Sequence, residues 1–273
     1  MSMENSNEST NQDAARPRRR GIYVLPNAIT LASLFAGFYS IVMAMNGRFE
    51  IAVLGIFAAA VLDGLDGRVA RMTNSQSAFG EQMDSLCDMV NFGAGPALIV
   101  YIWALKDMGN IGWLPAFVYI AGAALRLARF NTNIAIVDKR FFQGLPSPAA
   151  AALLMSFIWV MDDAGFKSVL SIGWLTWLAF GFTLFAGLSM VSNVPYYSFK
   201  VIGGRRTVPF IVIVAIALAI ALISLHPSRA LFIVFCSYAL SGYGVYLWRR
   251  AKGKPVSVIA ISTDEPDEKG LHP

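Results

Sequence analysis

Long apolar stretches alternate with short polar ones along most of the chain. An α-helix needs about 20 predominantly apolar residues to cross the hydrocarbon core of a bilayer. Stretches near that length occur at 25–46, 50–72, 79–105, 111–134, 146–162, 168–192, 207–225 and 229–249. The pattern therefore predicts an all-α, polytopic membrane protein: a bundle of about eight transmembrane helices.

Two polar segments flank this apolar region. Residues 1–20 end in a basic cluster, and residues 251–273 carry a run of carboxylates. Such segments cannot bury enough apolar surface to fold. We therefore expect disordered cytoplasmic tails on either side of a membrane domain at 21–250. The polar residues that precede the first apolar stretch also argue against a cleavable signal peptide.

Positive charge is distributed unequally between the two sides of the predicted bundle. If both termini face the cytoplasm, 18 of the 22 lysines and arginines fall on the cytoplasmic side and 4 on the other. Cytoplasmic loops of membrane proteins carry such an excess. We expect both termini inside, in the cell (inner) membrane. The basic N-terminal run is better explained by this topology, or by attraction to anionic lipid, than by nucleic-acid binding.

The composition supports the membrane assignment and narrows the chemistry. Charged residues make up 14% of the 273 residues, against about a quarter in soluble domains. Cys87 and Cys236 lie inside apolar stretches, so no disulfide framework is indicated. His226 and His272 are the only histidines in the sequence, which disfavours histidine-centred mechanisms.

Four aspartates interrupt two consecutive apolar stretches. Asp63 and Asp66 are three residues apart, and Asp84 and Asp88 are four apart, so each pair shares one face of its helix. Gly80 lies on the same face as the second pair. A short polar connection joins the two stretches, so the helices must be antiparallel neighbours. Their acidic faces can therefore meet near the cytoplasmic surface.

Carboxylates this close repel one another unless protons or cations neutralise them. Two divalent ions would balance the four charges, and oxygen ligands without a nearby histidine favour Mg²⁺ or Mn²⁺ over zinc. Gly67 and Gly80 allow a ligand to approach the backbone. Arg71 lies one turn beyond Gly67 and can reach an anion held at the metals. One intramembrane aspartate can be a structural hydrogen-bonding group, but four at helical spacing favour a site.

This arrangement resembles a known signature, that of the CDP-alcohol phosphatidyltransferase family. Every position of the signature is matched by Asp63-x-x-Asp66-Gly67-x-x-Ala70-Arg71, eight further residues, and Gly80-x-x-x-Asp84-x-x-x-Asp88. The stretch PNAIT (26–30) resembles the family's N-terminal nucleotide-contacting segment. Three segments resemble the phosphatidylserine synthase branch: RLARFN (126–131), GLPSP (144–148) and SNVPY (192–196). Eight spans rather than six also resemble that branch.

The resemblance implies a reaction and a set of site residues. In this branch the phosphatidyl group of CDP-diacylglycerol passes to the hydroxyl of L-serine, giving phosphatidylserine and CMP. Two divalent ions would be held by Asp63, Asp66, Asp84 and Asp88, and Asp88 would also be the catalytic base. The implied contacts to CDP-diacylglycerol are Asn27, Thr30, Gly67, Ala70, Arg71, Ser77 and Gly80. The resemblance further implies a homodimer.

The acceptor alcohol and two other classes of protein stay open at this point. Arg126 and Arg129, at the end of the fourth predicted helix, could bind the serine carboxylate, or could anchor the helix or bind lipid phosphate. Glycerol 3-phosphate or inositol phosphate is an alternative acceptor. A membrane prenyltransferase also binds a diphosphate through acidic motifs, but its motifs lie further apart in the sequence. A cation transporter would place its acids nearer the midplane of the membrane.

Overall fold

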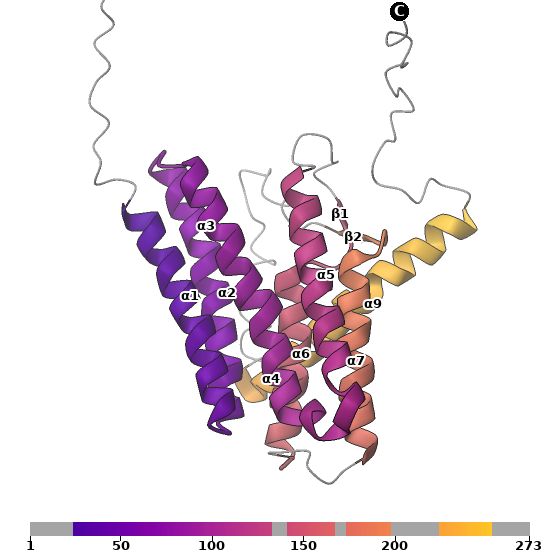
Figure 1. The fold of residues 1–273 in the computed structure, drawn as a ribbon. Coiled ribbons are helices and arrows are strands. Elements are labelled where there is room, and N and C mark those ends of the chain that lie inside the picture. The colour runs from indigo at the N-terminus through magenta and orange to yellow at the C-terminus, as the bar shows by residue number, and fades with distance from the viewer. Residues whose placement is uncertain (1–23, 133–140, 167–172, 198–223, 253–273) are drawn as a thin grey trace, which may run out of the picture.

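The structure, a computed structural model, describes residues 24–132, 141–166, 173–197 and 224–252. Both expected tails and almost all of the predicted span at 207–225 lie outside the described residues. The described part is a bundle of helices, with α9 crossing the others at a slant (Figure 1). In chain order the α-helices are α1 (Val24–Met45), α2 (Phe49–Met72), α3 (Ala78–Asp88), α4 (Gly95–Val100), α5 (Trp113–Thr132), α6 (Ser147–Asp163), α7 (Gly173–Val191) and α9 (Pro227–Ala251).

The chain stays helical between α3 and α5, but its winding changes. Two π-helical segments, η2 (Met89–Ala94) and η3 (Tyr101–Leu105), enclose α4, and the 3₁₀ helix η4 (Lys106–Ile111) follows. The predicted span at 79–105 is therefore one long helical rod of mixed geometry. The apolar pattern could not reveal this change, because a π-helical turn adds one residue without altering the hydrophobicity of the stretch.

The predicted helical membrane bundle is confirmed within the described residues. Four stretches are long and apolar enough to cross a membrane: Leu25–Met45, Ala78–Ile111, Gly173–Val191 and Pro227–Ala251. Helices also occupy the predicted spans at 50–72, 111–134 and 146–162. The first of these carries the charges of the acidic motif, which lower its mean hydropathy. The count of eight spans stays a prediction.

A short antiparallel ribbon joins two distant parts of the chain and was not predicted. Strand β1 (Phe141–Gln143) pairs with β2 (Pro195–Tyr197), with Gln143 opposite Pro195. The Gly144 N–H donates to the Val194 carbonyl at 2.9 Å, and its positive φ of 77° turns the chain from β1 toward α6. The segments GLPSP and SNVPY therefore lie side by side at one end of the bundle.

Small residues allow α1 and α2 to pack closely. A side chain on Gly55 would collide with the hydroxyl of Ser40 and approach the carbonyl of Ala36. Ala52 and Ala59 on the same helix are fully buried. Lipid tails are as apolar as leucine, so helix association in a bilayer depends on such close van der Waals packing. The packing fixes the start of α1 beside the end of α2, where the acidic motif lies.

Glycines serve the same purpose between α5 and α7. A Cβ atom on Gly187 would lie 2.8 Å from the Cα atom of Tyr119, and one on Gly122 would strike the Gly187 carbonyl. Backbone atoms cannot rotate away as a flexible side chain can. The two helices therefore approach only because neither position carries a side chain.

We predict that Gly187→Ala destabilises the protein. Overpacking of a close helix contact costs about 1–3 kcal/mol. The matched control is Gly244→Ala on α9, because no atom lies within 4 Å of a Cβ there and alanine favours the helix by up to about 1 kcal/mol. Thermal unfolding of detergent-solubilised protein should give a lowered Tm for the first variant and an unchanged or raised Tm for the second. Equal Tm values would contradict the packing account.

Candidate active site

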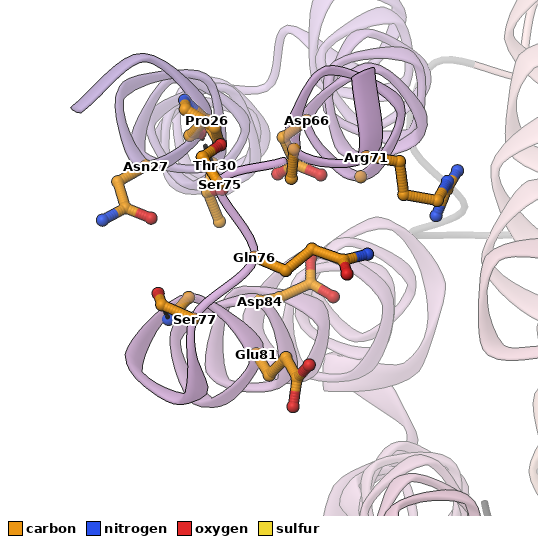
Figure 2. A pocket seen from close by; sticks show the side chains of 13 residues that line it. Pro26, Asn27, Thr30, Asp66, Arg71, Ser75, Gln76, Ser77, Glu81 and Asp84 are labelled. Carbon is orange, nitrogen blue, oxygen red and sulfur yellow. Dashed lines mark hydrogen bonds between the residues drawn. The ribbon is translucent and has the colours of Figure 1, made fainter. Parts of the chain in front are cut away.

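Three helix ends enclose a polar cavity at the end of the bundle that carries the ribbon. Its volume is about 230 Å³, and it lies between the start of α1, the end of α2 and the start of α3 (Figure 2). The lining residues are Pro26, Asn27, Thr30, Asp66, Gly67, Ala70, Arg71, Ser75, Gln76, Ser77, Gly80, Glu81 and Asp84. All seven residues expected to contact CDP-diacylglycerol are among them. The structure thus brings together residues that are up to 53 positions apart, from Asn27 to Gly80.

The start of α3 is fixed by a helix cap that also shapes the cavity. Ser77 is the N-cap residue, and its Oγ accepts a hydrogen bond from the Gly80 N–H at 3.0 Å. Among the described residues no acceptor takes the hydroxyl proton of Ser77, so this proton is available to a ligand. A Cβ on Gly80 would lie 3.2 Å from Ser77 Oγ and 3.4 Å from Asn27 Oδ1. Glycine at this position therefore keeps space open between α1 and α3.

Three carboxylates form a cluster where α2 faces α3. One oxygen from each of Asp63, Asp66 and Asp84 lies within 4.8 Å of the other two. Figure 2 shows the side chains of Asp66 and Asp84 on facing helices, on either side of the cavity. Asp66 is only 4% exposed and lies beside the Thr30 hydroxyl. Asp88 is outside this group of three, but its carboxyl is within hydrogen-bonding range of Asp63.

The cluster is electrostatically unfavourable by itself. If ionised, two carboxylates whose oxygens lie within 4.8 Å of each other repel by about 3 kcal/mol at an effective dielectric constant near 20. Protons or cations must therefore offset the repulsion.

The residues present fit divalent cations. Asp66 Oδ2 and Asp88 Oδ1 are buried and have no hydrogen-bond partner among the described residues. Buried polar atoms in proteins are almost always paired, so an unpaired one calls for an explanation. A bound cation would supply the missing partner of both oxygens. An all-oxygen set of carboxylates suits Mg²⁺ or Mn²⁺, and Mg²⁺ usually keeps positions for water or substrate phosphate. The structure does not distinguish between the two metals.

The two arginines of α5 have different surroundings. Arg126 is half-buried, interacts electrostatically with Asp88 and donates from Nη1 to Ser147 Oγ at 2.8 Å. Its Nε is buried without a partner among the described residues. Arg129 instead donates to the Val191 carbonyl at 3.2 Å and to Asn193 at 3.4 Å. The sequence did not distinguish these two arginines. In the structure Arg126 interacts with Asp88, whereas Arg129 bonds to the end of α7 and to Asn193.

Several residues of the site were missed at the sequence level. Ser75 and Gln76 line the cavity because the polar connection between α2 and α3 runs along its edge, and Glu81 follows Gly80 on α3. Their position between the two halves of the acidic motif could have indicated that they line the site. Asn131 donates to Ser85 at 3.1 Å, which links α5 to the acidic face of α3. No feature of the sequence indicated that pair.

A family model described as CDP-alcohol phosphatidyltransferase matches residues 23–185. The chain belongs to the CDP-alcohol phosphatidyltransferase family. The matched region contains the whole cavity, the four aspartates and both arginines of α5.

Relatives of this phosphatidyltransferase include three proteins named CDP-diacylglycerol–serine O-phosphatidyltransferase. The one from Helicobacter pylori (strain J99) is 36% identical over 227 residues, covering 83% of this chain and 92% of the relative. The Mycobacterium tuberculosis (strain H37Rv) protein is 32% identical over 234 residues, covering 82% and 79%. The Methanocaldococcus jannaschii protein is 30% identical over 227 residues, covering 82% and 96%.

We predict that Mn²⁺ reverses the order of thermal stability between the wild type and variants of the carboxylate cluster. In metal-free protein, Asp63→Asn, Asp66→Asn and Asp84→Asn should each raise the Tm, because each removes one repelling charge. Mn²⁺ should raise the Tm of the wild type above all three, and each substitution should weaken Mn²⁺ binding about tenfold or more. Electron paramagnetic resonance of free Mn²⁺ measures the binding directly.

Asp107→Asn is the matched control for these substitutions, since Asp107 is an exposed carboxylate on η4, outside the cluster. It should change neither Mn²⁺ binding nor the order of the Tm values. Wild-type Mn²⁺ binding in any of the three cluster variants would remove that carboxylate from the proposed ligands.

Proposed function

We propose that this protein transfers the phosphatidyl group of CDP-diacylglycerol to the hydroxyl of L-serine, forming phosphatidylserine and releasing CMP. The observation that carries the proposal is the carboxylate cluster of α2 and α3 beside a polar cavity of about 230 Å³. The names of the relatives supply the substrates, and the helical membrane bundle provides the setting for a lipid reaction. The protein is then an integral membrane enzyme of phospholipid biosynthesis.

The cavity is proposed to receive the CDP part of the donor. Asn27, Thr30 and Ser77 supply polar groups around it, while Gly67, Ala70 and Gly80 leave room for the ligand to approach the helices. Arg71 lies next to Gly67, 3.6 Å from the position of a Cβ there, and its guanidinium suits a diphosphate. The diacylglycerol chains stay in the lipid, so a site at the end of the bundle accommodates both parts of an amphipathic donor.

Asp63, Asp66, Asp84 and Asp88 are the proposed ligands of two divalent ions, Mg²⁺ or Mn²⁺. Bound there, the ions would neutralise charge on the phosphoryl oxygens and on the departing phosphate. The chain's own contribution is to hold four carboxylates close enough to share those ions. It also excludes water from part of the cluster, because Asp66 is almost fully buried.

Asp88 is the proposed general base. The serine hydroxyl oxygen forms a bond to the phosphorus that carries diacylglycerol, and the bond from that phosphorus to the bridging oxygen of CMP breaks. The hydroxyl proton passes to the Asp88 carboxylate. The place of Asp88 at the edge of the cluster, next to Asp63 and near Arg126, supports this role, because a base must reach the incoming acceptor.

Arg126 is the proposed contact for the serine carboxylate. It lies toward Asp88 and retains an unpaired buried Nε among the described residues. Arg129 was an equal candidate from the sequence, but its bonds to Val191 and Asn193 favour a role in holding the end of α7. Serine bound at Arg126 would have its hydroxyl close to the base.

The arrangement in the membrane is also a proposal. We propose eight spans in the cell (inner) membrane, with both termini, the tails 1–20 and 251–273 and the active site cytoplasmic, around a membrane domain at 21–250. The excess of Lys and Arg on that side supports this orientation. Family resemblance supports a homodimer.

Reporter fusions after residue 273 test the topology. A reporter that works only in the cytoplasm should be active there, and a reporter that works only in the periplasm should be inactive. Activity of the periplasmic reporter would refute the proposed topology.

A competition assay tests the acceptor. Purified protein receives CDP-diacylglycerol, Mn²⁺ and equal concentrations of L-serine, glycerol 3-phosphate and inositol 1-phosphate. The expected lipid product is phosphatidylserine, released with CMP. A product containing either phosphorylated acceptor would reject serine while leaving phosphatidyl transfer intact. Absence of CMP release with every acceptor would reject the transferase itself.

Variants of the two arginines sharpen this assay. A hydrogen bond to a charged group contributes about 1.5–3 kcal/mol, so Arg126→Ala should raise the serine KM about tenfold or more. The KM for CDP-diacylglycerol should change little. Arg129→Ala is the control and should lower the Tm while leaving the serine KM near the wild-type value. The reverse result would exchange the roles of the two residues.

A further inference from the structure

A chain of buried polar groups crosses the bundle beneath the carboxylate cluster. Asn91, with no exposed surface, donates from Nδ2 to Ser33 Oγ at 2.8 Å. Ser33, also fully buried, donates to the Ala59 carbonyl at 2.8 Å. Because the single hydroxyl proton of Ser33 is used on Ala59, Asn91 must present its NH₂ group to Ser33. The chain therefore ties η2 to α1 and α2 in one defined orientation.

Each member of this polar chain lies one helical turn from a residue of the site. Ala59 precedes Asp63 by four residues, Ser33 follows Thr30 by three, and Asn91 follows Asp88 by three. Residues at these spacings are neighbours along a helix face. The polar chain thus fixes how α1, α2 and η2 are positioned along their axes relative to one another, directly next to the cluster.

The helix that carries Asp88 changes its winding at the next residue. The π-helical segment η2 begins at Met89, and the carbonyl of Phe92 within it accepts a hydrogen bond from the Tyr119 hydroxyl at 3.0 Å. Wider turns of this kind occur often at functional sites. Here the wide turn is held from both sides, by Ser33 of α1 and by Tyr119 of α5. The last turn of α3, with Asp88, is therefore anchored immediately below the site.

The contribution of Asn91 to stability does not explain why an amide side chain is buried at this position. Its Oδ1 is buried without a partner among the described residues, and an unpaired buried acceptor is costly. The neighbouring position on α1 must also be glycine, because a Cβ on Gly37 would overlap the Asn91 amide and lie 3.4 Å from its Cα atom. An apolar side chain would avoid the unpaired oxygen. This favours a role in placing the helix that carries Asp88.

We propose that Asn91, acting through Ser33, is a positioning residue that holds Asp88 against Asp63 where it can accept the acceptor's proton. The inference rests on the proposed function, because it concerns the base of that reaction. Neither Asn91 nor Ser33 lines the cavity. A loss of positioning should therefore slow the chemical step and leave substrate capture nearly unchanged.

Asn91→Ala and Ser33→Ala test the proposal in purified full-length protein. A misplacement of about 1 Å can cost up to about 100-fold in rate, so kcat should fall about 10- to 100-fold in each. The KM values for CDP-diacylglycerol and serine should stay within about threefold of wild type. The double variant should lose no more than the worse single variant, since both break the same chain. Gly37→Ala should reproduce the kcat defect with Asn91 intact, because its methyl group displaces the amide.

Ser156→Ala is the matched control, because Ser156 is a fully buried serine whose hydroxyl, among the described residues, bonds to Leu153 of its own helix at 3.1 Å. It should keep the wild-type kcat. A folded Ser33→Ala protein with wild-type kcat would overturn the proposal. Ser33→Ala therefore decides the test by itself if Asn91→Ala does not fold. Defects confined to KM or to Tm would overturn it equally. Failure of the wild type to release CMP would instead reject the proposed function, so the two failures are distinguishable.

Discussion

Repulsion among the aspartates of α2 and α3 is the constraint around which the rest of the structure is arranged. Three carboxylate oxygens within 4.8 Å of one another would drive these helices apart, and the low dielectric of a bilayer strengthens the effect. The fold resists by joining the two helices through a short connection and packing both against α1. A divalent ion bound there, as we propose, would neutralise charges that the fold holds close together. Removing the repulsion would then contribute to the affinity for the metal.

The surrounding helices hold the cluster through close backbone contacts and isolated hydrogen bonds. Gly55 and Gly187 permit near approach of helices, whereas Ser33, Asn91 and Tyr119 link helices through buried polar groups. The ribbon of β1 and β2 lies just before α6, whose first residue, Ser147, accepts a hydrogen bond from Arg126.

The sequence was sufficient to predict the helices and the acidic faces, because apolar length and a spacing of three or four residues determine both. All seven residues that the family resemblance implied around CDP line one cavity, although Ser75, Gln76 and Glu81, which line it too, were not predicted. The sequence could not separate Arg126 from Arg129, since their difference arises from partners on α6 and α7 far away in the chain. The π-helical turn after Asp88, the ribbon and the pairing of Asn91 with Ser33 depend on tertiary contacts that leave no periodic signal. The span at 207–225 lies outside the described residues, so the count of eight is still a prediction.

Anomalous X-ray scattering from crystals or bicelle-grown samples containing Mn²⁺ tests the central claim most directly, because it locates the metal without reference to activity. The account predicts anomalous density between α2 and α3, in contact with Asp63, Asp66 and Asp84 and extending toward Asp88. Ordered Mn²⁺ at another part of the protein, with none between these two helices, would contradict it.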